Sequence, residues 1–231
     1  MIKKESVVLL SGGLDSSVNF YAALQESNVR LALTFNYGQK AAEKEIEAAQ
    51  KLAQLNSVDH VVVDLPWLKN LGESSLTKEK ISVPLGSKIS IDNRQVSEQT
   101  AKAVWVPNRN GVFLNIAGSY AESLRAEVII PGFNREEAVT FPDNSLDYMR
   151  SVRKSFIYST ANQVDVQCYT IAMSKIEIVE LGKKLNVPFE MIWPCYQSGP
   201  LWCGQCESCQ RAKRAFMAAR IEHEHMFEKY L

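Results

Sequence analysis

Short apolar runs alternate with helical patterns along most of this 231-residue chain. Five runs have the length and residue types of buried strands, and they lie at 7–10, 30–36, 60–65, 127–132 and 164–171. Strands that alternate with helices favour a parallel sheet that is covered by helices on both faces. We therefore predict a doubly wound α/β fold, in which ligands bind beyond the carboxyl ends of the strands.

The segments between the strands repeat apolar residues at helical spacing. They predict helices over 16–26, 42–53, 113–124, 146–156 and 175–185. A further helix is expected over 207–230, after a cysteine-rich segment. The stretch 66–103 contains prolines, glycines and polar runs, which favour loops and small elements that form a mobile lid.

Composition narrows the classes of partner. With 46% hydrophobic residues the chain can form one sizeable domain. Its 26 basic and 26 acidic side chains balance, which disfavours nucleic acid as a direct partner. The sequence has no apolar run of the roughly 18 residues that a membrane helix needs, and its start lacks a signal-peptide cleavage pattern. We therefore expect a cytoplasmic protein without membrane contact.

A glycine-rich loop after the first strand is the strongest functional signal. It comprises Leu10, Ser11, Gly12, Gly13, Leu14, Asp15, Ser16 and Ser17. A helix that begins in this loop directs free backbone N–H groups and its positive dipole end toward an anion. The glycines allow close approach and unusual backbone angles, and the serine hydroxyls add donors. Phosphate is the expected occupant.

Asp15 within this loop indicates a metal ion as well. A carboxylate repels a neighbouring phosphate unless a cation intervenes, which suggests Mg²⁺. The loop lacks the lysine and the spacing of a GxxxxGK[ST] phosphate loop. The alternative is an ordinary glycine turn in which Asp15 caps the helix.

Four of the five cysteines crowd into one C-terminal segment. They are Cys195, Cys203, Cys206 and Cys209. Four thiolates suit a closed, structural Zn²⁺ site, and an iron–sulfur cluster is the main rival. The remaining Cys168 is expected to be a core residue within the fifth strand. His223 and His225 are expected on a solvated helix face.

The glycine-rich loop resembles the motif of a known superfamily. The stretch SGGLDSS at 11–17 is similar to the SGGxDS motif of the PP-loop ATP pyrophosphatases, which cleave ATP between the α and β phosphates. The whole pattern resembles the 7-cyano-7-deazaguanine (preQ0) synthases of the QueC family, from Val7 to about Phe216. The matching segments are NYGQ at 36–39, VPNRN at 106–110, FPD at 141–143 and the four-cysteine segment.

The resemblance implies an ATP-dependent C–N ligase. Such an enzyme converts 7-carboxy-7-deazaguanine and ammonia to the nitrile through adenylated intermediates, in queuosine and archaeosine biosynthesis. It implies a nucleotide-binding α/β domain over 1–190 with ATP and Mg²⁺, a zinc-binding segment and helix over 191–231, and a homodimer. The residues it assigns are Asp15, Arg109 and Lys175 as catalytic, and Asn108, Arg109, Asn110 and Asp143 as substrate-binding.

Several alternatives stay open. Arg109 could be a surface charge, Asp143 the N-cap of the following helix, and Lys175 a solvated lysine in a first helical turn. The chain departs from the family pattern in the expected substrate pocket, at 40–41, 108, 137–138 and 144–145. These departures leave room for a different carboxylate or a tRNA base as substrate. A zinc-stabilised nucleotide-binding module without catalysis is a further alternative.

Overall fold

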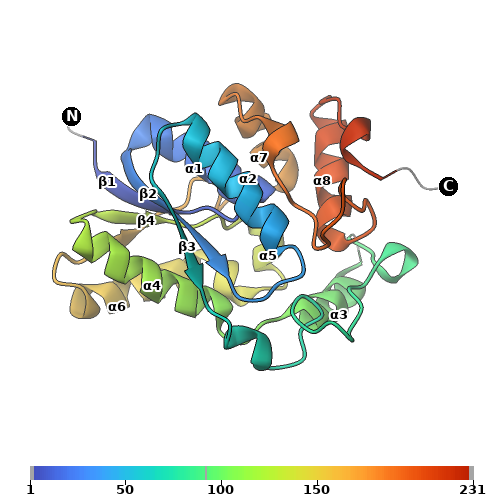
Figure 1. Cartoon of the computed structure of the whole chain (residues 1–231), viewed down its shortest axis with the longest axis horizontal. Coiled ribbons are helices and arrows are strands. Elements are labelled where there is room, and N and C mark those ends of the chain that lie inside the picture. The colour runs from blue at the N-terminus through green and yellow to red at the C-terminus, as the bar shows by residue number, and fades with distance from the viewer. Residues whose placement is uncertain (1–2, 92, 229–231) are drawn as a thin grey trace.

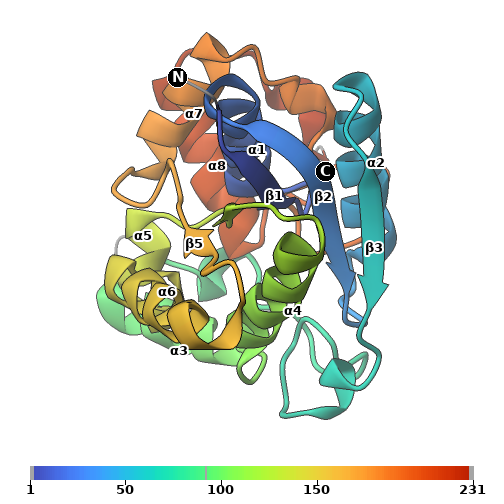
Figure 2. The same ribbon diagram turned by 90° about the vertical axis from the view of Figure 1, so that its left-hand side faces the viewer.

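The core of the molecule is a five-stranded parallel sheet in the order β3-β2-β1-β4-β5 (Figure 1, Figure 2). The computed structural model describes residues 3–91 and 93–228. The strands are β1 (Glu5–Leu9), β2 (Asn28–Asn36), β3 (His60–Asp64), β4 (Val128–Ile130) and β5 (Asp165–Val166). The predicted parallel α/β sheet is confirmed. Strand order reverses between β1 and β4, and such a switch point is where this architecture opens a crevice.

Helices cover both faces of the sheet. They are α1 (Leu14–Glu26), α2 (Ala42–Leu55), α3 (Arg94–Val104), α4 (Arg109–Ser123), α5 (Arg135–Ala138), α6 (Leu146–Ser159), α7 (Lys175–Lys184) and α8 (Glu207–Ala218). Short 3-10 helices occupy Leu68–Asn70, Gly86–Lys88, Pro142–Asn144, Phe189–Met191 and Glu224–Met226. Among the described residues, no helix combines the length and the apolarity needed to cross a membrane.

Alternating side chains of β1 place one buried layer on each face. Val8 packs in a cluster with α1, α2, α7 and α8. Val7 packs in a second cluster with α4 and α6 on the opposite face. Both valines are fully buried, as expected for a central parallel strand covered on both sides. Figure 1 shows these two helical layers above and below the sheet.

The stretch 66–103 contains an 11-residue helix, α3, that the sequence pattern did not predict. The side chain of Asn93 caps this helix by accepting hydrogen bonds from the N–H groups of Gln95 and Val96. Two of its buried residues, Ser97 and Thr100, are polar. Because these positions break the apolar stripe, hydrophobic periodicity does not reveal the helix.

Two expectations for the C-terminal part are wrong. Helix α8 ends at Ala218, because Arg220 takes up a left-handed backbone conformation with φ 54°. His223 is buried, stacks on Phe216 at 6.1 Å between ring centroids, and bonds through Nδ1 to the carbonyl of Ile221. Only His225 is exposed as expected. The predicted helix end at Tyr230 lies outside the described residues.

The fifth strand is also shorter than predicted. Its ladder covers only Asp165–Val166, so Cys168 does not lie within a strand. Beyond Val166, hydrogen bonds that involve side chains take the place of backbone pairing with a neighbouring strand. The Thr170 hydroxyl donates to the carbonyl of Phe133 at 2.6 Å, and the Asn19 amide oxygen accepts from the N–H of Tyr169 at 2.9 Å. Cys168 is half-buried, with its thiol 3.2 Å from the same Phe133 carbonyl.

The cysteine segment packs directly on the sheet. One buried apolar cluster contains Val8 and Leu10 of the first strand region together with Cys206 and Phe216. Helix α8, which begins directly after Cys206 and contains Cys209, packs against α7. The predicted division at residue 190 therefore separates two parts that share one core, and the boundary itself stays a prediction.

Helix α7 packs so closely on its neighbours that a side chain at Gly182 has no space. A Cβ atom there would lie 2.6 Å from the Phe189 ring and 3.0 Å from Val18. We expect Gly182→Ala to lower the free energy of unfolding by about 1–2 kcal/mol, because overpacking costs more than the ~1 kcal/mol gained in helix propensity. Urea unfolding measures this, with the exposed Lys184→Ala in the same helix as the control. An unchanged or raised stability of the glycine variant would contradict the packing.

Candidate functional site

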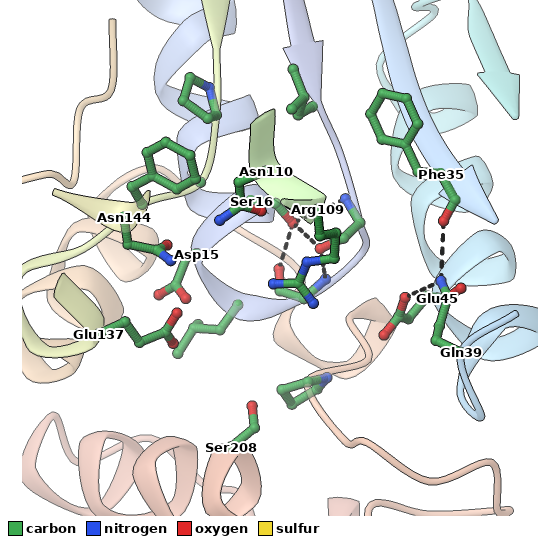
Figure 3. Close-up of a pocket in the computed structure, with 18 of the residues that line it drawn as sticks. Asp15, Ser16, Phe35, Gln39, Glu45, Arg109, Asn110, Glu137, Asn144 and Ser208 are labelled. Carbon is green, nitrogen blue, oxygen red and sulfur yellow. Dashed lines mark hydrogen bonds between the residues drawn. The ribbon is translucent and has the colours of Figure 1, made fainter. Parts of the chain in front are cut away.

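A cavity of about 230 Å³ opens at the carboxyl ends of β1, β2 and β4 (Figure 3). It lies at the switch point in strand order, where the fold predicts a ligand. Its walls come from the loop after β1, the end of β2, the start of α4, α5, the start of α7 and the cysteine segment. Segments far apart in the sequence therefore meet around one space.

The glycine-rich loop forms one wall of this cavity. Six of its eight predicted residues line the cavity, namely Leu10, Ser11, Gly13, Leu14, Asp15 and Ser16, whereas Gly12 and Ser17 do not. The hydroxyls of Ser11 and Ser16 bond to each other at 2.9 Å and tighten the turn. Gly13 is the N-cap of α1 and supplies no side-chain acceptor, so the alternative of Asp15 as the cap is wrong. The first N–H groups of α1 remain available to an anion.

The two glycines of the loop serve different purposes. Gly12 has φ +75°, and a Cβ there would lie 2.7 Å from the carbonyl oxygen of Glu45 and 2.8 Å from Cβ of Ala48. Gly12 is thus needed where α2 packs behind the loop. Gly13 has an ordinary φ of −75°, and its Cβ position meets only the Ser11 hydroxyl at 3.4 Å. The expectation of unusual backbone angles is therefore right for Gly12 and wrong for Gly13.

A buried lysine joins the loop to two other elements. The ammonium of Lys175, the first residue of α7, bonds to the Asp15 carboxylate and, at 2.7 Å, to that of Glu137 on α5. The side-chain amide of Asn134 donates to Asp15 at 3.3 Å. Lys175 is 4% exposed, so the alternative of a solvated lysine is wrong. Figure 3 shows Asp15 and Glu137 side by side at one end of the cavity.

Burial and charge act in opposite directions on this cluster. Burial opposes the charge of Lys175, but the two carboxylates raise its pKa above the ordinary value. Burial raises the pKa of Asp15 to about 6, against the attraction of Lys175. Burial also opposes the charge of Glu137, and Lys175 lowers its pKa. The Oδ1 atom of Asp15 is buried and has no hydrogen-bond partner among the described residues. Two carboxylates face one ammonium, so the cluster keeps an excess of negative charge, and the unpartnered carboxylate oxygen could bind a divalent cation.

Arg109 faces the cavity from the start of α4, as the sequence predicts. Asn108, the N-cap of α4, has a left-handed backbone conformation with φ 51° and is exposed outside the cavity wall. The Arg109 guanidinium donates to the Tyr37 hydroxyl at 3.1 Å and lies 5.6 Å from the centre of that ring. Asn110 is buried and lines the cavity. Arg109 is half-buried over a ring, so its interpretation as a surface charge is wrong.

Asp143 lies behind the cavity wall. It is in the 3-10 turn before α6, and its neighbour Asn144 lines the cavity. The N-cap of α6 is Ser145, whose hydroxyl accepts from the N–H of Tyr148, so the capping alternative for Asp143 is wrong. Burial raises the pKa of Asp143, and the charge of Arg109 opposes this rise.

The four clustered cysteines form a buried cage. Their sulfur atoms all lie within 4.8 Å of one another. Backbone N–H groups of Gln197 and Cys203 donate to the sulfur of Cys195, and those of Gln205 and Cys206 donate to that of Cys203, at 3.3–3.4 Å. Amide donors stabilise thiolate charge, which is the form that binds a metal. The cage could therefore hold a metal ion.

The cage also helps to build the cavity. The cavity wall includes Trp193, Pro194 and Tyr196, which flank Cys195 in the chain, and Ser208 and Ala212 of α8. Figure 3 shows Ser208 of α8 facing the cavity from opposite the glycine-rich loop. A metal at the cysteines would thus hold part of this wall in place.

Comparisons with known proteins agree with this geometry. The family model described as "Queuosine biosynthesis protein QueC" matches residues 5–220. A protein of Bdellovibrio bacteriovorus named 7-cyano-7-deazaguanine synthase is 57% identical over 98% of both chains. Proteins with the same name from Desulforamulus reducens and Methanosarcina barkeri are 50% and 43% identical, over 91% and 94% of this chain and 92% and 96% of their own.

The chain belongs to the QueC family. The family resemblance that the sequence motifs predicted is therefore confirmed. Because the match covers nearly the full length of each relative, it includes the glycine-rich loop, the start of α4 and the cysteine cage alike.

This QueC protein has a third carboxyl group in the cavity, besides Asp15 and Glu137, that the sequence pattern did not single out. Glu45 of α2 lies at the end opposite Asp15 (Figure 3). The Gln39 side-chain amide donates to Glu45 at 2.8 Å and to the Phe35 carbonyl at 3.1 Å. The Gln39 carbonyl oxygen accepts from the N–H of Tyr37 at 3.0 Å, so this amide is fully engaged. Only the NYGQ motif pointed here, since Glu45 itself reads as a polar residue of an amphipathic helix.

Burial raises the pKa of Glu45 to about 7. The folded state therefore binds this proton more tightly than the unfolded chain, and ionising Glu45 costs folding free energy as pH rises toward 7. We expect Glu45→Gln to remove that cost. The stability of the variant relative to the wild type should rise between about pH 5 and pH 8.

Urea unfolding at the two pH values measures the difference. The exposed Glu43→Gln in the same helix is the control and should show little change. An equal response of both variants to pH would contradict a buried Glu45 carboxyl.

Proposed function

We propose that this chain is a 7-cyano-7-deazaguanine synthase, an ATP-dependent ligase that makes the nitrile from 7-carboxy-7-deazaguanine and ammonia. The observation that carries the proposal is the match to proteins of that name over nearly the whole of both chains. The cavity supports it, because anion donors, an arginine and a buried lysine cluster converge at one space. The product is a precursor in queuosine biosynthesis, in keeping with the family's description.

The reaction needs activation because a carboxylate is a poor electrophile. Attack of a carboxylate oxygen on the α-phosphate of ATP forms an acyl adenylate and releases pyrophosphate. Ammonia then displaces AMP and loses a proton, which gives the amide. Adenylation of the amide oxygen by a second ATP releases a second pyrophosphate, and loss of AMP together with both protons of the amide nitrogen gives the nitrile. Negative charge on phosphate oxygens is the common feature of these steps, so preorganised donors should dominate catalysis.

The glycine-rich loop is the proposed triphosphate site. Free N–H groups at the start of α1 face the cavity, and the hydroxyls of Ser11 and Ser16 lie beside them. The Lys175 ammonium at the far side of Asp15 adds positive charge at the same wall. These groups would hold the phosphates and orient the α-phosphate toward the acid.

Arg109 is the proposed clamp for an anionic group of the ligands. Its guanidinium is half-buried and is held over Tyr37, which leaves further N–H groups for a carboxylate or a phosphate. Asn110 and Asn144 line the cavity near it and could contact the heterocycle. Asp143, which lies behind the wall, would act on the substrate through Arg109 and Asn110. Asn108 is exposed and is not part of the cavity wall.

Asp15 and Glu137 are the proposed ligands of Mg²⁺. The unpartnered Oδ1 of Asp15 and the net negative charge of the cluster fit a cation with oxygen ligands. When bound, the ion neutralises phosphate charge in the ATP complex. Asp15 and Glu137 supply the carboxylate ligands, and the ammonium of Lys175 holds these two carboxylates in position by bonding both.

The metal of the cysteine cage is proposed to be zinc with a structural role. Four sulfur donors leave no open position for a substrate. We further propose that ammonia enters as free ammonia, that the protein acts in the cytoplasm and that it forms a homodimer. The balanced charge agrees with a small-molecule substrate and no direct nucleic-acid partner.

The proposed activity predicts one product from three substrates. Purified protein with ATP, Mg²⁺, ammonium and 7-carboxy-7-deazaguanine should release AMP and pyrophosphate and form the nitrile, which mass spectrometry identifies. Asp15→Asn should lower kcat by about 100-fold, because loss of one electrostatic contact to the transition state costs about 3 kcal/mol. Arg150→Lys at an exposed position is the control. Turnover of ATP without any nitrile would exclude this substrate and favour another carboxylate.

The zinc proposal predicts about one zinc per chain by elemental analysis. Cys206→Ser should lower the zinc content and reduce Tm by at least about 4 °C, since each kcal/mol lost shifts Tm by about 2–4 °C in a chain of this size. Cys168→Ser, outside the cage, should leave both unchanged. If the purified protein instead contains iron and acid-labile sulfide, the cage holds an iron–sulfur cluster and the zinc proposal is wrong.

A further inference from the structure

A buried ion pair lies in the first turns of α8, where Glu207 stands between Cys206 and Cys209 and Arg211 follows them. Arg211 donates through Nε and Nη2 to one oxygen of Glu207, at 3.1 and 2.7 Å. The other oxygen of Glu207 accepts from the Thr100 hydroxyl of α3 at 2.8 Å. Arg211 and Glu207 are each 6% exposed. The pair therefore joins the cysteine segment to α3 in the interior of the protein.

Arg211 also extends beyond this pair to α5. Its Nη1 donates to the carboxylate of Glu136 on α5 at 3.0 Å. The guanidinium of Arg214 donates to the same oxygen at 2.5 Å. The second oxygen of Glu136 accepts from the backbone N–H of Lys175 at 2.8 Å. One unbroken chain of hydrogen bonds thus runs from α3 through α8 and α5 to the start of α7.

The position of α5 depends on such outside contacts. This helix has four residues, Arg135–Ala138, and so few residues cannot hold a helical turn in place by their own hydrogen bonds. Glu136 and Glu137 are adjacent on it, and Glu137 bonds the Lys175 ammonium. A shift of Glu136 would therefore move Glu137 relative to Lys175 and Asp15, the carboxylate of the glycine-rich loop.

We propose that Arg211 is a positioning residue for the reaction, which links the cysteine segment and α3 to the carboxylates of α5. Its side chain is not part of the cavity wall, so it acts through Glu136. If Arg211 only stabilised α8 itself, its ion pair with Glu207, four residues away on the same helix, would be enough. The additional bond to Glu136, across 75 residues of sequence, is what a linking role requires.

This inference rests on the proposed function only for its kinetic readout. Removing the link should displace α5 by a small amount and lower kcat, because misplacement of groups by about 1 Å can cost about 100-fold in rate. The KM for ATP and the zinc content should change little, since the glycine-rich loop and the cysteines are left intact. Hydrogen exchange supplies a readout that needs no activity.

The test compares Arg211→Met, Arg211→Lys and Arg135→Met in the full-length, metal-containing protein. Arg135 is the matched control, because it lies on the same α5 and its ion pair with Glu177 of α7 is exposed. We expect faster amide exchange at residues 134–138 and a 10- to 100-fold lower kcat in Arg211→Met, at roughly unchanged zinc content. Arg211→Lys keeps the positive charge but loses the planar set of N–H donors that bonds Glu207 and Glu136 together. Its kcat and its amide exchange rates should therefore lie between those of the wild type and those of Arg211→Met. If Arg211→Met does not fold, Arg211→Lys carries the comparison.

A double-mutant cycle with Glu136→Gln completes the test. If the link runs through Glu136, Arg211→Met should lower kcat little further in that background. Fully additive effects, or unchanged exchange at α5 in both arginine variants, would overturn the inference. The inference would also be overturned if Arg211→Met lost zinc and stability while the fraction that remains folded kept a normal kcat. A wild-type protein that makes no nitrile would contradict the proposed function, and the exchange experiment would still decide the link.

Discussion

The ammonium of Lys175, buried between two carboxylates, holds the site together. Its partners come from three elements: the glycine-rich loop supplies Asp15, α5 supplies Glu137, and α7 begins with the lysine itself. A charge buried to this extent is costly unless it is paired and hydrogen-bonded, so each group requires the other two. The excess of negative charge and the unpartnered oxygen of Asp15 make the cluster receptive to a cation. The loop, α5 and α7 therefore form one functional unit.

The cysteine segment belongs to this unit as well. It lines the cavity through Trp193, Tyr196 and two residues of α8, and it shares a buried cluster with the central strands. The network through Glu207, Arg211 and Glu136 connects it to the carboxylates. A metal in the cage would then stabilise more than its own loop. In this QueC protein the cysteine cage and the cavity are connected by packing and by buried charge.

Part of this arrangement could be predicted from local patterns. The alternation of apolar runs and helical stripes predicted the parallel sheet, and the free N–H groups at the start of α1 follow from a strand, a glycine turn and a helix. Helix α3 was missed because polar residues occupy half of its buried positions. Cys168 and His223 were misplaced because their hydrogen bonds and ring contacts come from side chains of distant or irregular segments. The contact of Asp143 with the ligand stays a prediction, and the turn places its neighbour Asn144 at the cavity wall.

The sequence by itself determined the fold class, the glycine-rich loop, the four-cysteine cluster and the family, because each depends on residues close together in the chain or on a long run of matching motifs. Only the tertiary structure decided what the charged residues do to one another. Lys175 and Asp15 are 160 residues apart in the chain, and nothing in the local sequence of either specifies the other as its partner. Glu45 and Arg211 reach their positions only when α2 and α8 pack on the sheet. Burial then sets their charges and bonds, and burial is a property of the folded molecule and not of any short segment.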